Sequence, residues 1–186
     1  MKIIERKLKG IFEITLYPYI DERGYMVRLF DDKIFKNAGL NTKWVQESRS
    51  HTKKKYTIRG LHVSLPPSLE GKTITAIMGK VLWVVLDVRK NSKTFGQWDS
   101  IILSEELNNT LYAQRGFAHG CLSLSDNCDL LLRADNYFSD KRETGIVWND
   151  KDLNINWKLN GIDPIISERD NQYQTFSKFK EKYGGV

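Results

Sequence analysis

Two of the three histidines in this chain of 186 residues lie in strand-like sequence beside glycines. His62 follows Arg59-Gly60-Leu61, and His119 stands within Gly116-Phe117-Ala118-His119-Gly120. One histidine on a strand is usually a structural residue, whereas two, with glycines that let a ligand approach the backbone, indicate a site. Imidazole serves such a site either as a metal ligand or as a general base.

The metal alternative needs more ligands than the sequence around His62 supplies. Metal-binding β barrels of the cupin class usually carry His-x-His and a glutamate a few residues later. In this chain Ser64 takes the second histidine position, and Glu70 lies beyond a loop that contains Pro66 and Pro67. Because an open metal site keeps about three protein ligands, we expect neither a bound metal nor any other cofactor.

The general-base alternative needs a carboxylate behind the imidazole. Such a carboxylate fixes the tautomer of the ring and stabilises the imidazolium that forms when the base accepts a proton. His62 is the candidate base, and Lys72, in a strand-like stretch, is a cation that could stabilise an oxyanion. The residues alone leave the carboxylate open among four aspartates, which are Asp87, Asp150, Asp163 and Asp170.

Short strands are predicted through most of the chain, and they must position these side chains. Apolar runs bounded by turn residues recur about every 8 to 12 residues, which is typical of an all-β sandwich or barrel. The predicted strands span residues 10–16, 25–30, 56–63, 72–78, 81–88, 98–103, 110–113, 117–124 and 128–133. Helix is expected at 33–38 and 176–183 and near residue 107, and residues 64–71 are expected to form a loop over the site.

Length and composition favour a single domain over residues 1–186. Hydrophobic residues make up 40% of the chain, which is enough for one compact core. The net charge is +6, but the longest basic run is Lys53-Lys54-Lys55, so we expect a phosphate-bearing small ligand rather than nucleic acid or a membrane. Without a CxxC motif, a signal peptide or a membrane-spanning stretch, Cys121 and Cys128 are expected to be buried thiols of a cytoplasmic protein.

Six motifs, two of them the segments that contain His62 and His119, follow one another in order within residues 21–170. They are Arg59-Gly60-Leu61-His62; Pro66-Pro67 with Gly71-Lys72; Asp87-Val88-Arg89 with Ser92-x-Thr94-Phe95-Gly96; Gly116-Phe117-Ala118-His119-Gly120; Trp148-Asn149-Asp150; and Ser167-Glu168-Arg169-Asp170. In this order and at this spacing they resemble the dTDP-4-dehydrorhamnose 3,5-epimerase family. Any one of the motifs would be a weak signal, whereas six in register are a strong one.

The resemblance implies a cupin-type β barrel, or jelly roll, with a few short helices. It implies a metal-independent epimerase that acts on nucleotide-diphosphate-linked 4-keto sugars beside the ketone. It also implies a homodimer that exchanges N-terminal strands, which residues 10–16 could supply. The implied catalytic residues are His62 as the base, Asp170 as its partner and Lys72 as a cation near the C4 oxygen. The implied binding residues are Arg23 and Arg59 for the diphosphate, Gln46 near the nucleotide and His119 as a polar wall.

At four positions the chain departs from the pattern of the family it resembles. Leu132 stands where the family has the tyrosine that returns a proton from the opposite face, and Trp83 stands where it has an aspartate. Arg28 and Ser48 replace a glutamate and an asparagine, and Arg28 would change which base edges fit the nucleotide pocket. Because leucine cannot donate a proton, water or a hydroxyl such as that of Tyr137 must act instead, or only one carbon is inverted.

We therefore expect an epimerase that acts at C3, at C5 or at both carbons. Two other functions share most of the site. A keto-sugar isomerase would move the carbonyl between C4 and C3 with the same base, and a non-catalytic protein would bind the nucleotide sugar without any proton transfer. Exchange of a carbon-bound proton with deuterated water separates an enzyme from a binder.

Overall fold

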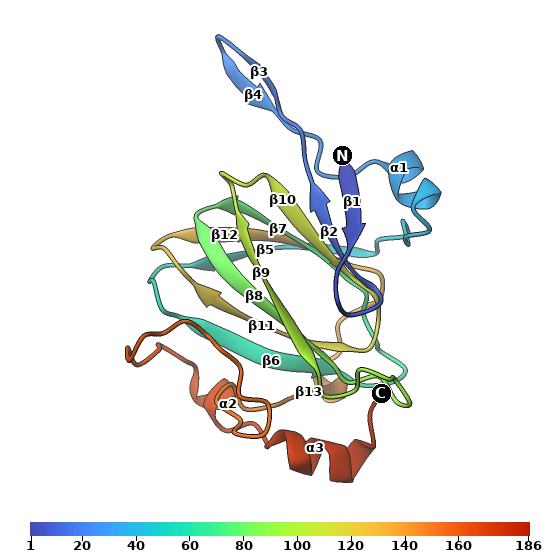
Figure 1. Cartoon of the computed structure of the whole chain (residues 1–186), viewed down its shortest axis with the longest axis vertical. Helices are drawn as coiled ribbons and strands as arrows, with labels where there is room; N and C mark the ends of the chain where they lie inside the picture. The colour runs from blue at the N-terminus through green and yellow to red at the C-terminus, as the bar shows by residue number, and fades with distance from the viewer.

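Two antiparallel β sheets lie face to face at the centre of the molecule, and the computed structural model describes residues 1–186 (Figure 1). The six-stranded sheet comprises, in spatial order, β1 (Lys2–Glu5), β2 (Ile11–Thr15), β10 (Asn109–Ala113), β7 (Lys72–Met78), β12 (Cys128–Ala134) and β5 (Gln46–Thr52). The five-stranded sheet comprises β13 (Glu143–Gly145), β6 (Ile58–Ser64), β11 (Phe117–Ser123), β8 (Lys80–Asp87) and β9 (Trp98–Ser104). The prediction of an all-β protein is confirmed.

Strand β8 shows why the chain forms a double layer. Trp83 and Val85 belong to the apolar cluster between the two sheets, whereas Leu82 and Val84 belong to a second cluster with the C-terminal segments. Successive side chains of a strand point to opposite faces, so an unbroken apolar run suits a strand that is covered on both sides. The strand predicted at 81–88, buried on both faces, is therefore confirmed.

The C-terminal part of the chain covers the outer face of the five-stranded sheet. Helices α2 (Glu168–Asn171) and α3 (Phe176–Tyr183) lie below β6 in Figure 1, and Phe179 of α3 is fully buried in the second cluster. Thr175 caps α3 by accepting a hydrogen bond from the Lys178 amide, and Gly184 ends the helix in the left-handed conformation. The helix predicted at 176–183 is confirmed, and it packs on its own barrel. None of the helices has the length and apolar sequence needed to cross a membrane.

The segment before β5 leaves the barrel as a hairpin and returns as a short helix. Strands β3 (Tyr19–Asp21) and β4 (Gly24–Met26) pair only with each other and project at the top of Figure 1. Helix α1 (Asp32–Asn37) is capped by the Asp31 carboxylate and buries Phe35, close to the predicted bounds. The strand predicted at 25–30 is wrong beyond Met26, because residues 27–30 have no strand to pair with and instead pack on the cluster around Phe35.

Strand β5 is the longest element that has no counterpart in the sequence prediction. It is an edge strand that pairs only with β12, and most of its side chains are polar and exposed. Such an edge lacks the apolar alternation by which strands are predicted. The region near residue 107, expected to be helical, is a turn between β9 and β10. Cys121 and Cys128 are buried free thiols, as predicted.

Candidate active site

A cavity of about 240 Å³ lies between the two sheets, and each sheet supplies one wall. We call the group from the five-stranded sheet the five-stranded wall: Arg59, His62, Trp83, His119, Gly120 and Cys121. We call the group from the other sheet the six-stranded wall: Ser50, Lys72, Leu130 and Leu132. Five of the residues expected to form the site therefore line one cavity, although they come from four separate strands.

An irregularity in β6 aligns the two histidines. His62 pairs with His119, but Arg59 pairs with Cys121, so β6 has one more residue than β11 between these two pairs. Gly60 lies in this stretch with a φ of 94°, and a Cβ there would come within 2.4 Å of the His119 carbonyl oxygen. Only glycine fits this position, and the bulge lets both imidazoles line the same cavity.

His62 is held by Asp170. Its Nε2 lies 3.0 Å from Asp170 Oδ1, and Asp170 Oδ2 accepts a hydrogen bond of 2.8 Å from the Gly60 amide. Burial opposes ionisation of this carboxyl group, but the hydrogen bonds from His62 and Gly60 outweigh burial and lower its pKa to about 2. An ionised Asp170 accepts a hydrogen bond from the Nε2–H group, which leaves the lone pair of Nδ1 free. The neutral ring therefore has the tautomer of a general base.

Two residues beside Asp170 also reach His62, and nothing in the sequence motifs singles them out for this role. The Tyr173 ring packs edge-on against His62 with the ring centroids 5.8 Å apart, and burial raises the pKa of its phenol to about 12. Arg169 Nη2 lies 3.5 Å from His62 Nε2 and pairs with Glu143 at 2.6 Å. Their only sequence signal is their proximity to Asp170 along the chain.

Lys72 stands at the start of β7, on the six-stranded wall, beside a buried carboxylate. Its Nζ lies 2.7 Å from Glu70 Oε2, and the side chains are 22% and 5% exposed, respectively. Glu70 entered the sequence argument only as a displaced metal ligand, and the fold instead pairs it with the cation. An ammonium group has three N–H donors, so this pair leaves two of them for a ligand. No group of three or more His, Cys, Asp or Glu side chains is placed to hold a metal ion.

His119 is a buried imidazole of the five-stranded wall with one nitrogen unpaired. Burial, together with the nearby charges of Lys72 and His62, holds its pKa well below the ordinary value. Trp83 Nε1 donates a hydrogen bond of 3.4 Å to His119 Nδ1, whereas Nε2 is buried without a partner in the protein. Trp83, which replaces the aspartate of the family pattern, is therefore in direct contact with His119.

A second hollow of about 330 Å³ adjoins the first, because Lys72 and Leu132 line both. Gln46, Ser48 and Phe138 are among its other lining residues. The Gln46 side chain accepts a hydrogen bond of 2.6 Å from the Phe138 amide. Gln46 thus lies beside the cavity that contains His62, on the side of the six-stranded wall.

Of the three arginines expected at the site, only Arg59 lines the cavity. Arg59 lines the cavity, where its Nε donates a hydrogen bond of 3.2 Å to Thr52 Oγ1. Arg23 lies on the projecting hairpin and pairs with Asp21, and Arg28 pairs with Asp31 after that hairpin. Neither Arg23 nor Arg28 lines the cavity of its own chain.

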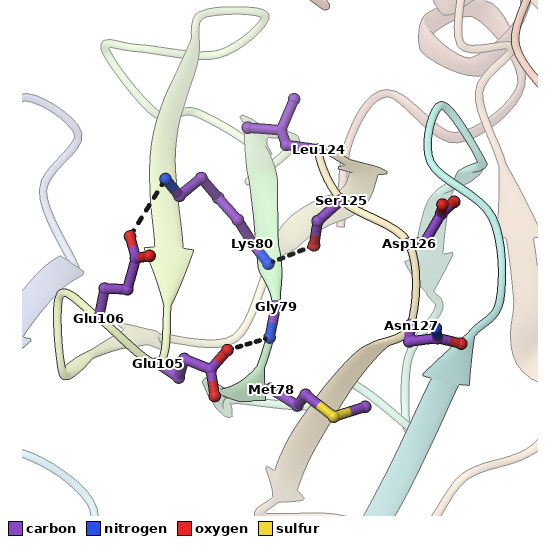
Figure 2. Close-up of a pocket in the computed structure, with 9 residues that line it drawn as sticks. All are labelled: Met78, Gly79, Lys80, Glu105, Glu106, Leu124, Ser125, Asp126 and Asn127. Carbon is purple, nitrogen blue, oxygen red and sulfur yellow. Dashed lines mark hydrogen bonds and ion pairs between the residues drawn. The ribbon is translucent and has the colours of Figure 1, made fainter.

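A larger hollow lies at the other end of β7 and contains none of the expected site residues. Its volume is about 410 Å³, and it is formed by the β7–β8, β9–β10 and β11–β12 turns. Figure 2 shows three bonds among its polar groups: Lys80 pairs with Glu106, Glu105 accepts from the Gly79 amide, and Ser125 accepts from the Lys80 amide. Five of the residues predicted from the sequence instead line the cavity between the sheets.

The chain is similar to known proteins over most of its length. The model of the family described as dTDP-4-dehydrorhamnose 3,5-epimerase matches residues 5–178. The enzyme of that name from Shigella flexneri is 35% identical over 177 residues, which cover 95% of this chain and 96% of that enzyme. The crystal structure of the enzyme from Elizabethkingia anophelis has a TM-score of 0.89 and 34% identity and covers 96% of this chain and 97% of its own. ChmJ, described as a 3'-monoepimerase from Streptomyces bikiniensis in complex with dTDP-quinovose, has a TM-score of 0.89 and 28% identity and covers 96% and 89%.

Proposed function

The chain belongs to the dTDP-4-dehydrorhamnose 3,5-epimerase family and has its cupin-type jelly roll, and on this premise we propose that it epimerises a nucleotide-diphosphate-linked 4-keto-6-deoxy sugar. The observation that carries the proposal is the His62–Asp170 pair, which lines one cavity together with Lys72 of the opposite wall. Enolisation beside a ketone requires a base for the proton and a cation or donor for the developing oxyanion. No cofactor enters this chemistry.

In the proposed reaction, His62 Nδ1 removes the proton from the carbon next to the ketone. The electron pair of the C–H bond becomes the second bond between the two carbons, and the π pair of the carbonyl moves onto the C4 oxygen. Lys72 donates a hydrogen bond to that oxyanion, a contribution typically worth about 3 to 4 kcal/mol. Asp170 stabilises the imidazolium that forms on His62. Inversion follows when the carbon takes a proton on its opposite face.

The proton-return step is the one for which the six-stranded wall has no phenol. Leu132 lines that wall and has no proton to donate. Tyr137, the nearest phenol in sequence, is 67% exposed and does not line the cavity. The Ser50 hydroxyl of the same wall, the Lys72 ammonium group or water is left as the donor, so we propose inversion at one carbon, at C3 in preference to C5. ChmJ, described as a 3'-monoepimerase, shows that inversion at C3 alone occurs in a protein of this fold.

Nucleotide binding is proposed for the rim of the cavity. The planar guanidinium of Arg59 suits two phosphate oxygens, and it lies in the same cavity as His62. Gln46 lines the adjoining hollow, which would place the nucleotide beyond Lys72. The formal net charge of +6 favours the approach of such an anion.

We further propose a homodimer in which the β3–β4 hairpin docks on a second copy. Four of its large apolar side chains are 63% to 77% exposed: Tyr19, Ile20, Tyr25 and Met26. Strand β2, the segment expected to be exchanged between subunits, is paired with β1 and β10 of its own chain. We therefore propose the hairpin, and not β2, as the segment that contacts the second copy. Docking would also carry Arg23 and Arg28 to the partner's cavity.

Sedimentation at micromolar concentration should give twice the chain mass of 21.6 kDa, and a species of one chain only would contradict the dimer.

A cytoplasmic location is also proposed. Cys121 and Cys128 remain free thiols in the fold, and burial raises the pKa of Cys121 to about 12, which keeps it unreactive. Unpaired, buried cysteines are usual in a reducing compartment. Fractionation of cells that express the chain would test the location.

Incubation with nucleotide-linked 4-keto sugars in deuterated water tests the proposed function. An epimerase incorporates deuterium at the inverted carbon, and proton NMR of the product shows which carbon that is. A keto-sugar isomerase would give a 3-keto product, and a non-catalytic binder would give no incorporation at all. Either result, across sugars carried on thymidine, cytidine and guanosine diphosphates, would overturn the proposal.

A further inference from the structure

We infer that Trp83 is a positioning residue that fixes His119 as a neutral Nε2–H donor to the ketone oxygen of the sugar and prevents it from acting as a second base. The inference deepens the proposed function and rests on it for the identity of that oxygen. The state of the His119 ring is a separate matter, because it can be observed without any substrate.

The tautomer follows from the chemistry of the partner. An indole nitrogen is a donor only, so the bond from Trp83 Nε1 requires a lone pair on His119 Nδ1. A neutral imidazole has one protonated and one unprotonated nitrogen, which places the proton on Nε2. His62 also carries its proton on Nε2 but donates that N–H to Asp170, so its free nitrogen, Nδ1, is an acceptor, whereas the free nitrogen of His119, Nε2, is a donor.

The surroundings keep His119 in this neutral state. The residue is 6% exposed, and both Lys72 and His62 lie close enough for their charges to disfavour an imidazolium. No carboxylate bonds to either ring nitrogen of His119, in contrast to the Asp170 carboxylate behind His62. Because Nε2 already carries the proton, a second proton could bind only at Nδ1, which would break the bond from Trp83 and leave a buried cation.

The unpaired Nε2–H indicates where the ligand lies. A buried donor without a partner costs free energy, and a ligand oxygen in the cavity would satisfy it. His119 and Lys72 belong to opposite walls of the same cavity, so an oxygen placed between them would receive one neutral and one charged donor. The ketone oxygen is the atom that gains charge on enolisation, and fixed donors act most strongly on such an atom.

Nitrogen-15 NMR of the labelled full-length protein tests the tautomer. The chain has only three histidines, so His51→Gln and His62→Gln assign the remaining ring to His119. We expect a neutral ring with the proton on Nε2 across the range of about pH 5 to 8.

Trp83→Phe removes the donor and should shift His119 towards a mixture of tautomers. Trp98→Phe is the matched control, because it loses an indole bond to a backbone carbonyl outside the cavity and should leave the His119 spectrum unchanged. A proton on Nδ1, or an imidazolium, in the unmodified protein would overturn the inference.

Two substitutions of His119 test the donor role. The glutamine amide can supply an N–H near the position of Nε2, whereas leucine supplies none, so kcat should fall by about 10²-fold in His119→Leu and by about tenfold or less in His119→Gln. Equal losses in the two variants would overturn the donor role. Failure of the proposed function itself would look different, since the unmodified protein would then incorporate no deuterium whatever the His119 tautomer.

Discussion

The two walls of the cavity differ in what their side chains can do with a proton. On the five-stranded wall, Asp170 bonds to His62 and Trp83 bonds to His119, so each ring has one nitrogen held by a neighbouring side chain. On the six-stranded wall, Lys72 is paired with Glu70, and the neighbouring Leu130 and Leu132 carry no exchangeable proton. In the proposed reaction the five-stranded wall thus supplies a positioned base for proton removal, whereas proton return is left to Lys72, the Ser50 hydroxyl or water. This asymmetry predicts an enzyme that exchanges a proton more readily than it inverts a carbon.

The largest expected effect comes from removing the base of the five-stranded wall. His62→Asn should lower turnover and deuterium incorporation by about 10³-fold, because a positioned general base typically contributes about 10² to 10⁴. Affinity for a nucleoside diphosphate, measured by calorimetry, should change little. His51→Asn is the matched control, since its side chain pairs with Asp129 away from the cavity. Full activity in His62→Asn would remove the base assignment.

Removing the carboxylate behind the base should have the second-largest effect. Asp170→Asn should lower kcat by about 10²-fold, because an amide does not hold the required tautomer or stabilise the imidazolium.

The same substitution should change the pH dependence of stability. The pKa of Asp170 is lowered from 3.8 to about 2, so its stabilising contribution is fully present above about pH 4 and is lost as the pH falls through 2. The shift corresponds to about 2 kcal/mol at neutral pH. Urea unfolding should therefore show Asp170→Asn less stable by about that amount at pH 7, with the gap narrowing towards pH 2. A gap that is constant with pH would contradict the assignment.

Adding a phenol to the six-stranded wall should reduce the asymmetry. Leu132→Tyr would place a hydroxyl at a position where the leucine side chain has only carbon. Deuterium incorporation at the second carbon should then rise about tenfold. Leu132→Phe adds the ring without the hydroxyl and serves as the control. Rapid incorporation at both carbons in the unmodified protein would show that the wall already has an acid.

Arg59→Lys should have a smaller effect, confined to binding. The substitution keeps the charge and loses the planar fork, so affinity for a nucleoside diphosphate should fall by about fivefold to tenfold. The difference should shrink at high salt, because screening weakens the phosphate contacts of both proteins. Arg49→Lys, at a pair with Asp129 outside the cavity, is the control. Equal affinities for Arg59→Lys and the unmodified protein would move the phosphate site away from β6.

No effect is expected from removing metal ions. Neither wall relies on a metal in the proposed chemistry, so incubation with a chelator should leave deuterium incorporation unchanged. Elemental analysis of the active protein should find no stoichiometric transition metal. Loss of activity that one added metal restores would contradict the mechanism.

The sequence by itself determined the features that depend on local pattern and residue type. Strands β7 and β8 follow from alternating or continuous apolar residues, and helix α3 follows from the spacing of Phe176, Phe179 and Tyr183. The absence of a proton on Leu132 is a property of leucine and holds in any fold. These features could be predicted because each depends on neighbours within a few residues.

Only the tertiary structure decided which side chains act together. Asp170 lies 108 residues from His62 in sequence, so no local pattern could choose it among four aspartates, and before the structure only the family resemblance indicated it. In the fold, Asp87 bonds to Arg89, Ser92 and Thr94, Asp150 accepts from backbone amides, and Asp163 is exposed. The bond from Trp83 to His119 and the pairing of the polar edge strand β5 likewise join segments far apart in the chain. Local periodicity carries no information about such contacts, because they join segments that become neighbours only in the folded chain.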